Sequence, residues 1–257
     1  MKVKFLGTGT SHGVPLVGCT CPTCSSTDPH NKRYRSSIWV TKPGCSLVVD
    51  TPAEFRLRCL EYCITRIDAL LLTHAHADHI AGLDDIRIYN EEQSMDIPLY
   101  CDAPTKHEIE ERFSYIFRET QLGGGKPRLK ITLLEHFKEF KAGGFDIMPV
   151  PLLHGELTIT GFIIDRKFAY LTDCSAIPEK TYAALSGLEV VVIDALRLTP
   201  HPTHFSLEQA TAAAGLINAK NTYFTHIAHA IEHVKVEEAL SPGIKLAYDG
   251  LEILLNQ

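Results

Sequence analysis

The chain has 257 residues, of which 45% are hydrophobic, so one large α/β domain with a sizeable core is possible. Its formal net charge of −6 argues against a surface built for long nucleic acid, which usually carries a basic patch. No run approaches about 18 consecutive apolar residues, and the N-terminus lacks the apolar core of a signal peptide, so we expect neither a membrane span nor export. We therefore predict a cytoplasmic protein with a single domain, residues 1–257.

The first predicted strand, residues 2–6, ends in a loop that contains two glycines. Gly7 and Gly9 permit a tight turn or a close approach of the backbone to a bound group, although an ordinary strand-to-loop turn explains them as well. His12 follows in the same loop. A single loop histidine is usually only solvated, so its role is left open.

Three cysteines at C-x-C-x-x-C spacing come next, in a loop at about residues 18–35. Cys19, Cys21 and Cys24 can all reach one ion, and a tetrahedral, thiolate-rich zinc site would stabilise a loop with little apolar content. Cytoplasmic cysteines indicate metal ligands or reduced thiols before disulfides. Three metal-free thiols are therefore the alternative. The candidates for a fourth ligand lie elsewhere in the chain: His30, Cys45 and His229.

Short strands and helices alternate in the next part of the chain. The predicted elements, in order, are strands at 36–41 and 46–50, a helix at 53–63, a strand at 68–72, a helix at 80–89, a strand at 99–101 and a helix at 105–118. The segment 102–128 contains Gly123-Gly124-Gly125, which match no phosphate-binding fingerprint. We expect a flexible connection there, and this segment is the natural place for a lid or a dimer contact.

A dense group of metal-competent side chains follows the strand at 68–72, in the stretch T-H-A-H-A-D-H at 73–79. His74 and His76 should point the same way, because side chains alternate along an extended segment. A turn after Ala77 would aim Asp78 and His79 at a second point nearby. Three imidazoles and one carboxylate suit Zn, Mn or Fe better than Ca or Mg.

Strand character returns in the second half of the chain. The predicted elements are strands at 145–150, 158–165, 167–171, 190–194, 222–225, 245–248 and 251–254, with helices at 178–185 and 206–216. Asp249-Gly250 predicts a hairpin between the last two strands. His154, Asp173 and His226 stand just past strand ends, as is typical of α/β active sites. Two strand-rich halves with closing helices indicate a four-layer fold, with sheet packed on sheet and helices outside.

The set T-H-A-H-A-D-H, His154, Asp173 and His226 resembles the metallo-β-lactamase superfamily over nearly the whole chain. That resemblance implies an αββα sandwich with a two-metal site at one edge. The cysteine loop, L-T-D-C at 171–174, H-F-S-L at 204–207 and T-H-I-A-H at 225–229 are similar to the PhnP family of cyclic phosphodiesterases, which act on phosphoribosyl cyclic phosphate. Related branches, including a protein of pyrroloquinoline quinone biosynthesis, share parts of this pattern.

The resemblance also implies a role for each residue of the motifs. Two active-site ions, Mn or Zn, are implied on two sets of ligands bridged by Asp173: His74, His76 and His154 for one ion, and Asp78, His79 and His226 for the other. It implies that His229 completes the structural zinc site of Cys19, Cys21 and Cys24. His204 matches a catalytic histidine of the relatives, and we count His204 and Asp78 as candidate catalytic residues.

The implied function is hydrolysis of a small, cyclic phosphodiester by a dinuclear metal-bound hydroxide. One alternative is a nuclease of the tRNA-processing type, which would need a basic arm that the sequence does not show. Another is a non-catalytic binding or carrier protein of cofactor biosynthesis, although such proteins tend to lose metal residues. We expect a small substrate as partner, no long nucleic acid and no membrane, and we leave a homodimer open.

Overall fold

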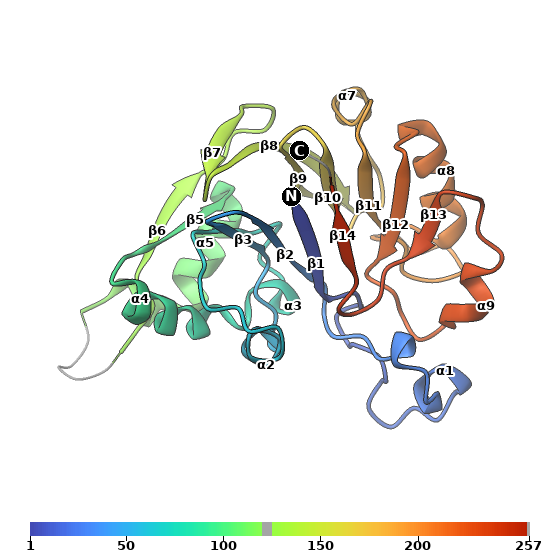
Figure 1. The fold of residues 1–257 in the computed structure, drawn as a ribbon, viewed down its shortest axis with the longest axis horizontal. Coiled ribbons are helices and arrows are strands. Elements are labelled where there is room, and N and C mark those ends of the chain that lie inside the picture. Colours follow the sequence, from blue (N-terminus) through green and yellow to red (C-terminus); the bar gives the residue numbers. More distant parts are fainter. Residues whose placement is uncertain (120–124, 256–257) are drawn as a thin grey trace.

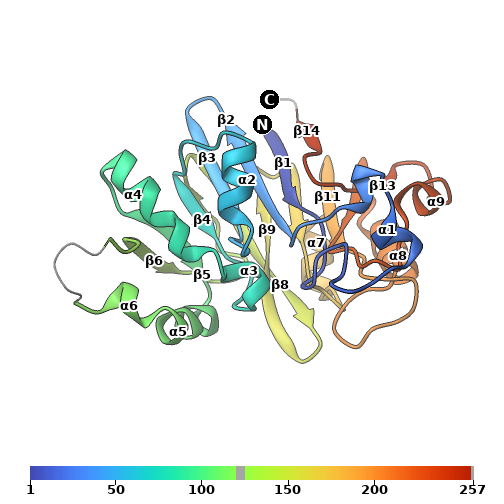
Figure 2. The same cartoon turned by 90° about the horizontal axis from the view of Figure 1, so that it is seen from below.

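The computed structural model describes residues 1–119 and 125–255. Two seven-stranded sheets pack face to face, with helices on the outer side of each (Figure 1). Seen from below in Figure 2, the long strands β8 and β9 run through the middle of the molecule, between the helices of the two halves. The predicted αββα sandwich is confirmed.

The first sheet has the strand order β14-β1-β2-β3-β4-β5-β6. Neighbouring strands are antiparallel from β14 to β3 and parallel from β3 to β6. The strands are β1 (Lys2–Gly7), β2 (Ser37–Lys42), β3 (Cys45–Val49), β4 (Ala69–Leu71), β5 (Ile97–Cys101), β6 (Leu129–Leu133) and β14 (Glu252–Leu254).

The second sheet has the order β13-β12-β11-β10-β9-β8-β7, and it is parallel from β10 to β13. All five residues of β11 are buried, which explains its unbroken apolar run, because a parallel strand is covered on both faces. The strands are β7 (Phe140–Ala142), β8 (Phe145–His154), β9 (Leu157–Ile164), β10 (Phe168–Leu171), β11 (Val190–Asp194), β12 (Asn221–Thr225) and β13 (Ile244–Leu246).

The helices are short, and most cover the outer faces of the sheets. Ser206 begins α8 with a capping box that it forms with Gln209, as its position before an apolar run predicts. The helices are α1 (Pro22–Ser25), η1 (Pro29–Asn31), α2 (Phe55–Glu61), α3 (Ala77–Ile80), η2 (Leu83–Ile86), α4 (Arg87–Gln93), α5 (Ala103–Arg112), α6 (Ser114–Phe117), α7 (Glu179–Ala184), α8 (Leu207–Ile217) and α9 (His233–Glu237).

The main core lies between the two sheets, where alternate side chains of facing strands interdigitate. Phe5 and Val40 of the first sheet and Phe162 and Tyr170 of the second belong to this layer and are fully buried. Two further apolar layers hold the helices against the outer faces of the sheets. This packing leaves the strand ends as the place where polar side chains can gather.

The hairpin predicted at Asp249-Gly250 is wrong. β13 pairs with β12 in the second sheet, whereas β14 pairs with β1 in the first, so the chain changes sheets between them. Asp249 is held in that crossing, because its carboxylate accepts hydrogen bonds from Thr8 Oγ1 and from the Tyr34 amide, both at 2.7 Å. A turn dipeptide predicts only that the chain bends at that point. It does not predict which strands pair, and here both strands pair with strands from elsewhere in the chain.

Other boundaries also differ from the prediction. The helix expected at 80–89 is three shorter pieces, α3, η2 and α4, and the strands β6 and β7 were not predicted. The segment 102–128 contains α5 and α6, while Gly123 and Gly124 lie outside the described residues. Within 1–119 and 125–255, no helix is both long and apolar enough to cross a bilayer.

Candidate metal centres

Strand ends from both sheets bring the predicted histidines and aspartates together. The stretch that contains His74 and His76 leaves β4, His154 ends β8, Asp173 stands two residues past β10, and His226 directly follows β12. These side chains form two groups, within each of which the potential ligand atoms lie within 4.8 Å of one another. One group is His74, His76 and His154, and the other is Asp78, His79, Asp173 and His226.

The turn expected after Ala77 is the start of helix α3. His76 keeps an extended backbone at the N-cap of α3, and its ring centroid lies 4.5 Å from that of His74. Asp78 and His79 stand in the first turn of the helix and therefore face the second group. The structure thus places His74 and His76 in one group and Asp78 and His79 in the other.

Asp173 lies between the two groups. Its Oδ1 is 3.3 Å from His79 Nε2, and its Oδ2 is 3.1 Å from His226 Nε2. It also forms a compact set with His154, a member of the first group, and with His204. A carboxylate in this position can reach ions held by either group.

Several ring nitrogens of these groups are buried and have no hydrogen-bond partner among the described residues. They are His74 Nε2, His79 Nε2 and both nitrogens of His226. A buried polar atom without a partner is costly, and a divalent cation would satisfy one nitrogen of each of these rings. Imidazole and carboxylate donors of this kind suit first-row transition metals, so the residues fit the ions that the motif predicts.

Asp50 orients one of the candidate ligands and was not predicted. It follows β3, is fully buried, and accepts hydrogen bonds from the amide and the hydroxyl of Thr73, both at 2.9 Å. Its Oδ2 also lies 2.7 Å from His79 Nδ1. When Nδ1 donates its proton to this carboxylate, Nε2 is left free for a metal, a common arrangement around ligating histidines.

Asp194 orients His204 and was also missed. This last residue of β11 is fully buried, and its Oδ2 lies 3.1 Å from His204 Nδ1 and accepts the Phe205 amide at 3.1 Å. The ring of His204 stacks on that of His226 at 4.7 Å, and Asp194 Oδ1 is 3.5 Å from His226 Nδ1. One carboxylate thus positions the candidate catalytic histidine and stands next to a candidate ligand. The only sequence signal for it was an acidic residue at the end of an apolar strand.

Three residues of this region have left-handed backbones, although none is glycine. The φ angles are +64° at Asp50, +58° at Asp173 and +58° at His226. Such conformations cost free energy and are tolerated where surrounding structure holds them, often at functional sites. The backbone is therefore shaped to aim these side chains inward.

The charges of the cluster shift the pKa values of its members. Burial would lower the pKa of His79, but Asp173 and Asp50 outweigh it and hold that pKa well above its ordinary value. Burial would raise the pKa of Asp173, but His226 and His79 hold it well below the usual range. Burial and the nearby His226 lower the pKa of His204 to about 4, so its ring is uncharged near neutral pH.

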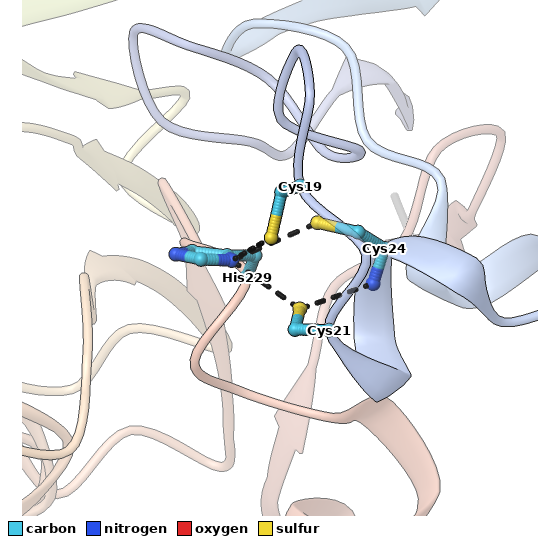
Figure 3. Close-up of side chains that lie close together, drawn as sticks. All are labelled: Cys19, Cys21, Cys24 and His229. Atoms are coloured by element: carbon cyan, nitrogen blue, oxygen red, sulfur yellow. Dashed lines mark hydrogen bonds between the residues drawn. The ribbon is translucent and has the colours of Figure 1, made fainter.

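The cysteine loop folds against the loop that carries His226. His229 Nδ1 lies 3.4 Å from the sulfurs of Cys19 and Cys21 and 3.6 Å from that of Cys24. Figure 3 shows the three sulfurs and the ring gathered around a common point. Of the three candidates for a fourth member, the structure brings His229 to this cluster. His30 instead stacks on His233, and Cys45 starts strand β3.

A cavity of about 420 Å³ lies between the cysteine cluster and the histidine–aspartate cluster. Its wall includes His229 from the first cluster and His204 from beside the second, together with Arg197, His201 and His12. The loop of His12 is placed by Ile227, whose amide donates to Thr8 O and whose carbonyl accepts from the Thr10 amide. His12 therefore lies on the wall of a cavity that also presents Arg197 and three other imidazoles, which its position in the sequence does not indicate.

Comparison with known proteins identifies the class. Residues 40–227 match the family described as the Beta-lactamase superfamily domain, so the fold is that of a metallo-β-lactamase superfamily protein. A crystal structure described as a new diphosphatase from the PhnP family is 40% identical, with a TM-score of 0.91 over 98% of this chain and 96% of its own. The chain belongs to the PhnP family of this superfamily, as its motifs indicated.

Two other relatives extend the comparison. The octanoyltransferase of Porphyromonas gingivalis is 35% identical over 260 residues, which are 100% of this chain but 52% of that protein. The chain thus spans about half the length of this curated relative. Zinc-bound PqqB from Methylobacterium extorquens has a TM-score of 0.81 over 99% of this chain and 100% of its own, but its 19% identity shows a shared fold alone.

Proposed function

We propose that this metal-dependent hydrolase cleaves a small, cyclic phosphodiester. The observation that carries the proposal is that two groups of candidate metal ligands meet at Asp173, beside His204, which itself lines a cavity that presents Arg197 and further imidazoles. Adjacent cations next to positively charged and hydrogen-bonding side chains suit a phosphate group. The 40% identity to a PhnP-family diphosphatase supports phosphorus–oxygen cleavage as the reaction type.

The proposed active site holds two divalent ions, Mn or Zn. His74, His76 and His154 would bind one, Asp78, His79 and His226 the other, and Asp173 both. Bound in this way, the ions would supply Lewis acidity toward the phosphate and activate water for the attack. The chain's own contribution is to hold His79 in place through Asp50, to hold His204 in place through Asp194, and to keep the site largely buried.

His204 would contact the substrate directly. Asp78 would contribute to catalysis as one of the metal ligands. In the free site the His204 ring is uncharged, and a proton on Nδ1 directed at Asp194 leaves Nε2 as the free ring nitrogen. A phosphate anion beside the ring favours its protonated form. That form can donate to the phosphate or protonate the departing sugar oxygen.

The direct test is a substrate panel run with the Mn- or Zn-loaded protein. We expect turnover of bis-p-nitrophenyl phosphate and faster cleavage of a cyclic five-membered phosphodiester than of a linear one. A diphosphate diester belongs in the panel because of the related diphosphatase. Cleavage of that diphosphate with no turnover of any phosphodiester would overturn the proposed substrate class.

Replacing Arg197 with alanine should raise KM for the phosphodiester about tenfold, equivalent to about 1.4 kcal/mol, with a smaller change in kcat. The guanidinium is on the cavity wall, where it also donates to the carbonyls of Thr199 and Pro200. Steady-state kinetics separate the two constants. Arg166→Ala, which removes an exposed arginine paired with Glu139, is the matched control and should change neither. An unchanged KM in Arg197→Ala would exclude a substrate contact.

The cysteine cluster is proposed to hold one structural zinc. Cys21→Ser should lose one equivalent of zinc by elemental analysis and lower Tm by about 5–10 °C, a loss of about 2–3 kcal/mol. The reason is that one ion would tie the cysteine loop to His229, which lies 208 residues after Cys21 in the chain. The control is Cys63→Ser, at an exposed cysteine outside the cysteine cluster. This variant should keep the zinc content and the Tm of the wild type. Wild-type zinc and melting in Cys21→Ser would refute the assignment.

Two alternatives use the same site. A tRNA-processing nuclease would bind its substrate with a steep dependence on salt concentration, which a binding titration at several salt concentrations would reveal. A carrier protein of cofactor biosynthesis would bind metal without turnover. The acyl-transfer activity named for the Porphyromonas relative belongs to a protein about twice as long, and we do not assign it to this chain.

A further inference from the structure

The cavity beside the metal clusters presents a second histidine, His201, which belongs to none of the recognised motifs. His201 lines this cavity together with His204 and Arg197, and its ring centroid lies 5.3 Å from that of His204. It lies outside each group of potential metal ligands found among the described residues. Any contact that His201 makes with a substrate is therefore a contact of the cavity wall and not of the metal site.

Hydrogen bonds from Thr203 define which ring nitrogen of His201 carries the proton. The amide of Thr203 donates to His201 Nδ1 at 3.3 Å, and the Thr203 hydroxyl lies 3.1 Å from the same nitrogen. An amide N–H only donates, so Nδ1 is the acceptor and the proton of the neutral ring is on Nε2. Burial, His204 and Arg197 lower the pKa of His201, which favours this neutral form. Among the described residues Nε2 has no hydrogen-bond partner, so its N–H is free to bind a ligand.

The loop that carries His201 is tied to the rest of the site. Its base is closed by the Leu196 amide, which donates to the Phe205 carbonyl at 3.0 Å. Nearer its tip, the Thr203 carbonyl lies 2.8 Å from Nδ1 of His154, a proposed metal ligand. A carbonyl only accepts, so Nδ1 of His154 donates and its Nε2 is left for an ion. Thr203 thus sets the tautomers of both histidines, and the His201 donor is held in place before any substrate arrives.

The two cavity histidines present opposite hydrogen-bonding groups. Nδ1 of His204 faces Asp194, which leaves Nε2 as the acceptor, whereas Nε2 of His201 is a donor. His204 belongs to a compact set with Asp173 and His154, and His201 lies one ring further along the wall. A phosphate held at the ions therefore meets His204 first. His201 is positioned to contact the part of the substrate that is bonded to this phosphate.

We propose that His201 is a specificity-determining residue whose Nε2 donates a hydrogen bond to an oxygen of the substrate's sugar. This inference rests on the proposed function, because it takes the phosphate to be held at the ions beside His204. An uncharged N–H suits an uncharged hydroxyl or ring oxygen. A substrate without that oxygen would leave the donor unpaired and would be disfavoured. The cavity thus selects the cyclic phosphate of a sugar over that of a simple diol.

Two cyclic phosphates that differ in their sugar oxygens test the contact. One is the five-membered cyclic phosphate of ribose, and the other is that of cis-cyclopentane-1,2-diol, which keeps the carbon ring but has no further oxygen. The metal-loaded wild type should have a kcat/KM about tenfold higher for the ribose compound, the effect of one hydrogen bond.

Two variants of His201 separate the donor from the loop contact. His201→Asn keeps an acceptor for the Thr203 amide but has no group at the Nε2 position. It should lower kcat/KM about tenfold for the ribose compound and less than about threefold for the cyclopentane compound. His201→Gln places an amide N–H near the Nε2 position and should keep most of the preference for ribose. Elemental analysis should show unchanged metal content in both variants.

His107→Asn, at an exposed histidine of α5, is the matched control and should change neither rate. Equal losses on the two compounds in His201→Asn would overturn the sugar contact. So would a His201→Gln variant that loses the preference while His201→Asn keeps it, because the ring would then serve only to hold the loop. Hydrolysis of neither compound by the wild type would overturn the proposed function, and this contact with it.

Discussion

Asp173→Ala should abolish both hydrolysis and metal binding. The carboxylate reaches the ring nitrogens of His79 and His226 and stands beside His154, so its loss removes a donor from both groups. We expect kcat to fall by about 10³-fold or more, since each fixed charge in such a site stabilises the transition state strongly. Elemental analysis after dialysis should show less than the full pair of active-site ions.

Asp173→Asn is the companion variant, because asparagine tolerates the left-handed backbone at this position better than alanine does. It removes the charge with little backbone strain and should lose metal as well. Asp146→Ala, at an exposed aspartate paired with Lys141, is the control for loss of an ordinary carboxylate. Retention of both ions by Asp173→Asn would refute the bridging role.

His204→Ala should lower kcat by about 10²–10⁴-fold, the range for general acid–base groups, while metal content stays at the wild-type level. The side chain touches the cavity and stacks on His226, yet the proposed ligand set does not include it. Single-turnover kinetics on a cyclic phosphodiester, together with elemental analysis, separate a chemical role from a structural one.

A better leaving group should narrow the difference between His204→Ala and wild type, because p-nitrophenolate needs less protonation than a sugar alkoxide. If the defect is equal for both substrates, the ring contacts the phosphate and does not act as the acid. His107→Ala is the control, as His107 is exposed on α5 and should leave turnover unchanged. Wild-type turnover by His204→Ala would remove this residue from the catalytic apparatus.

The sequence alone determined the features that depend on spacing and on alternation along the chain. His74 and His76 lie on one side of an extended segment and Asp78 and His79 in the following turn, because both facts depend on a few consecutive residues. The C-x-C-x-x-C loop likewise brings three sulfurs together locally. The αββα class followed from the apolar strands and from the family that the motifs resemble.

Only the tertiary structure decided which distant residues meet. Asp50 and Asp194 look like ordinary acids at strand ends, and they became partners of His79 and His204 because folding brings separate segments side by side. Strand β3 lies beside β4, which leads to His79, and the loop after β11 returns His204 to Asp194. His12 reached the cavity wall for the same reason. The turn signal at Asp249-Gly250 predicts a hairpin because it is local, whereas β13 and β14 find their partners in different sheets. Contacts between distant segments depend on the packing of the whole core, which no short stretch of sequence encodes.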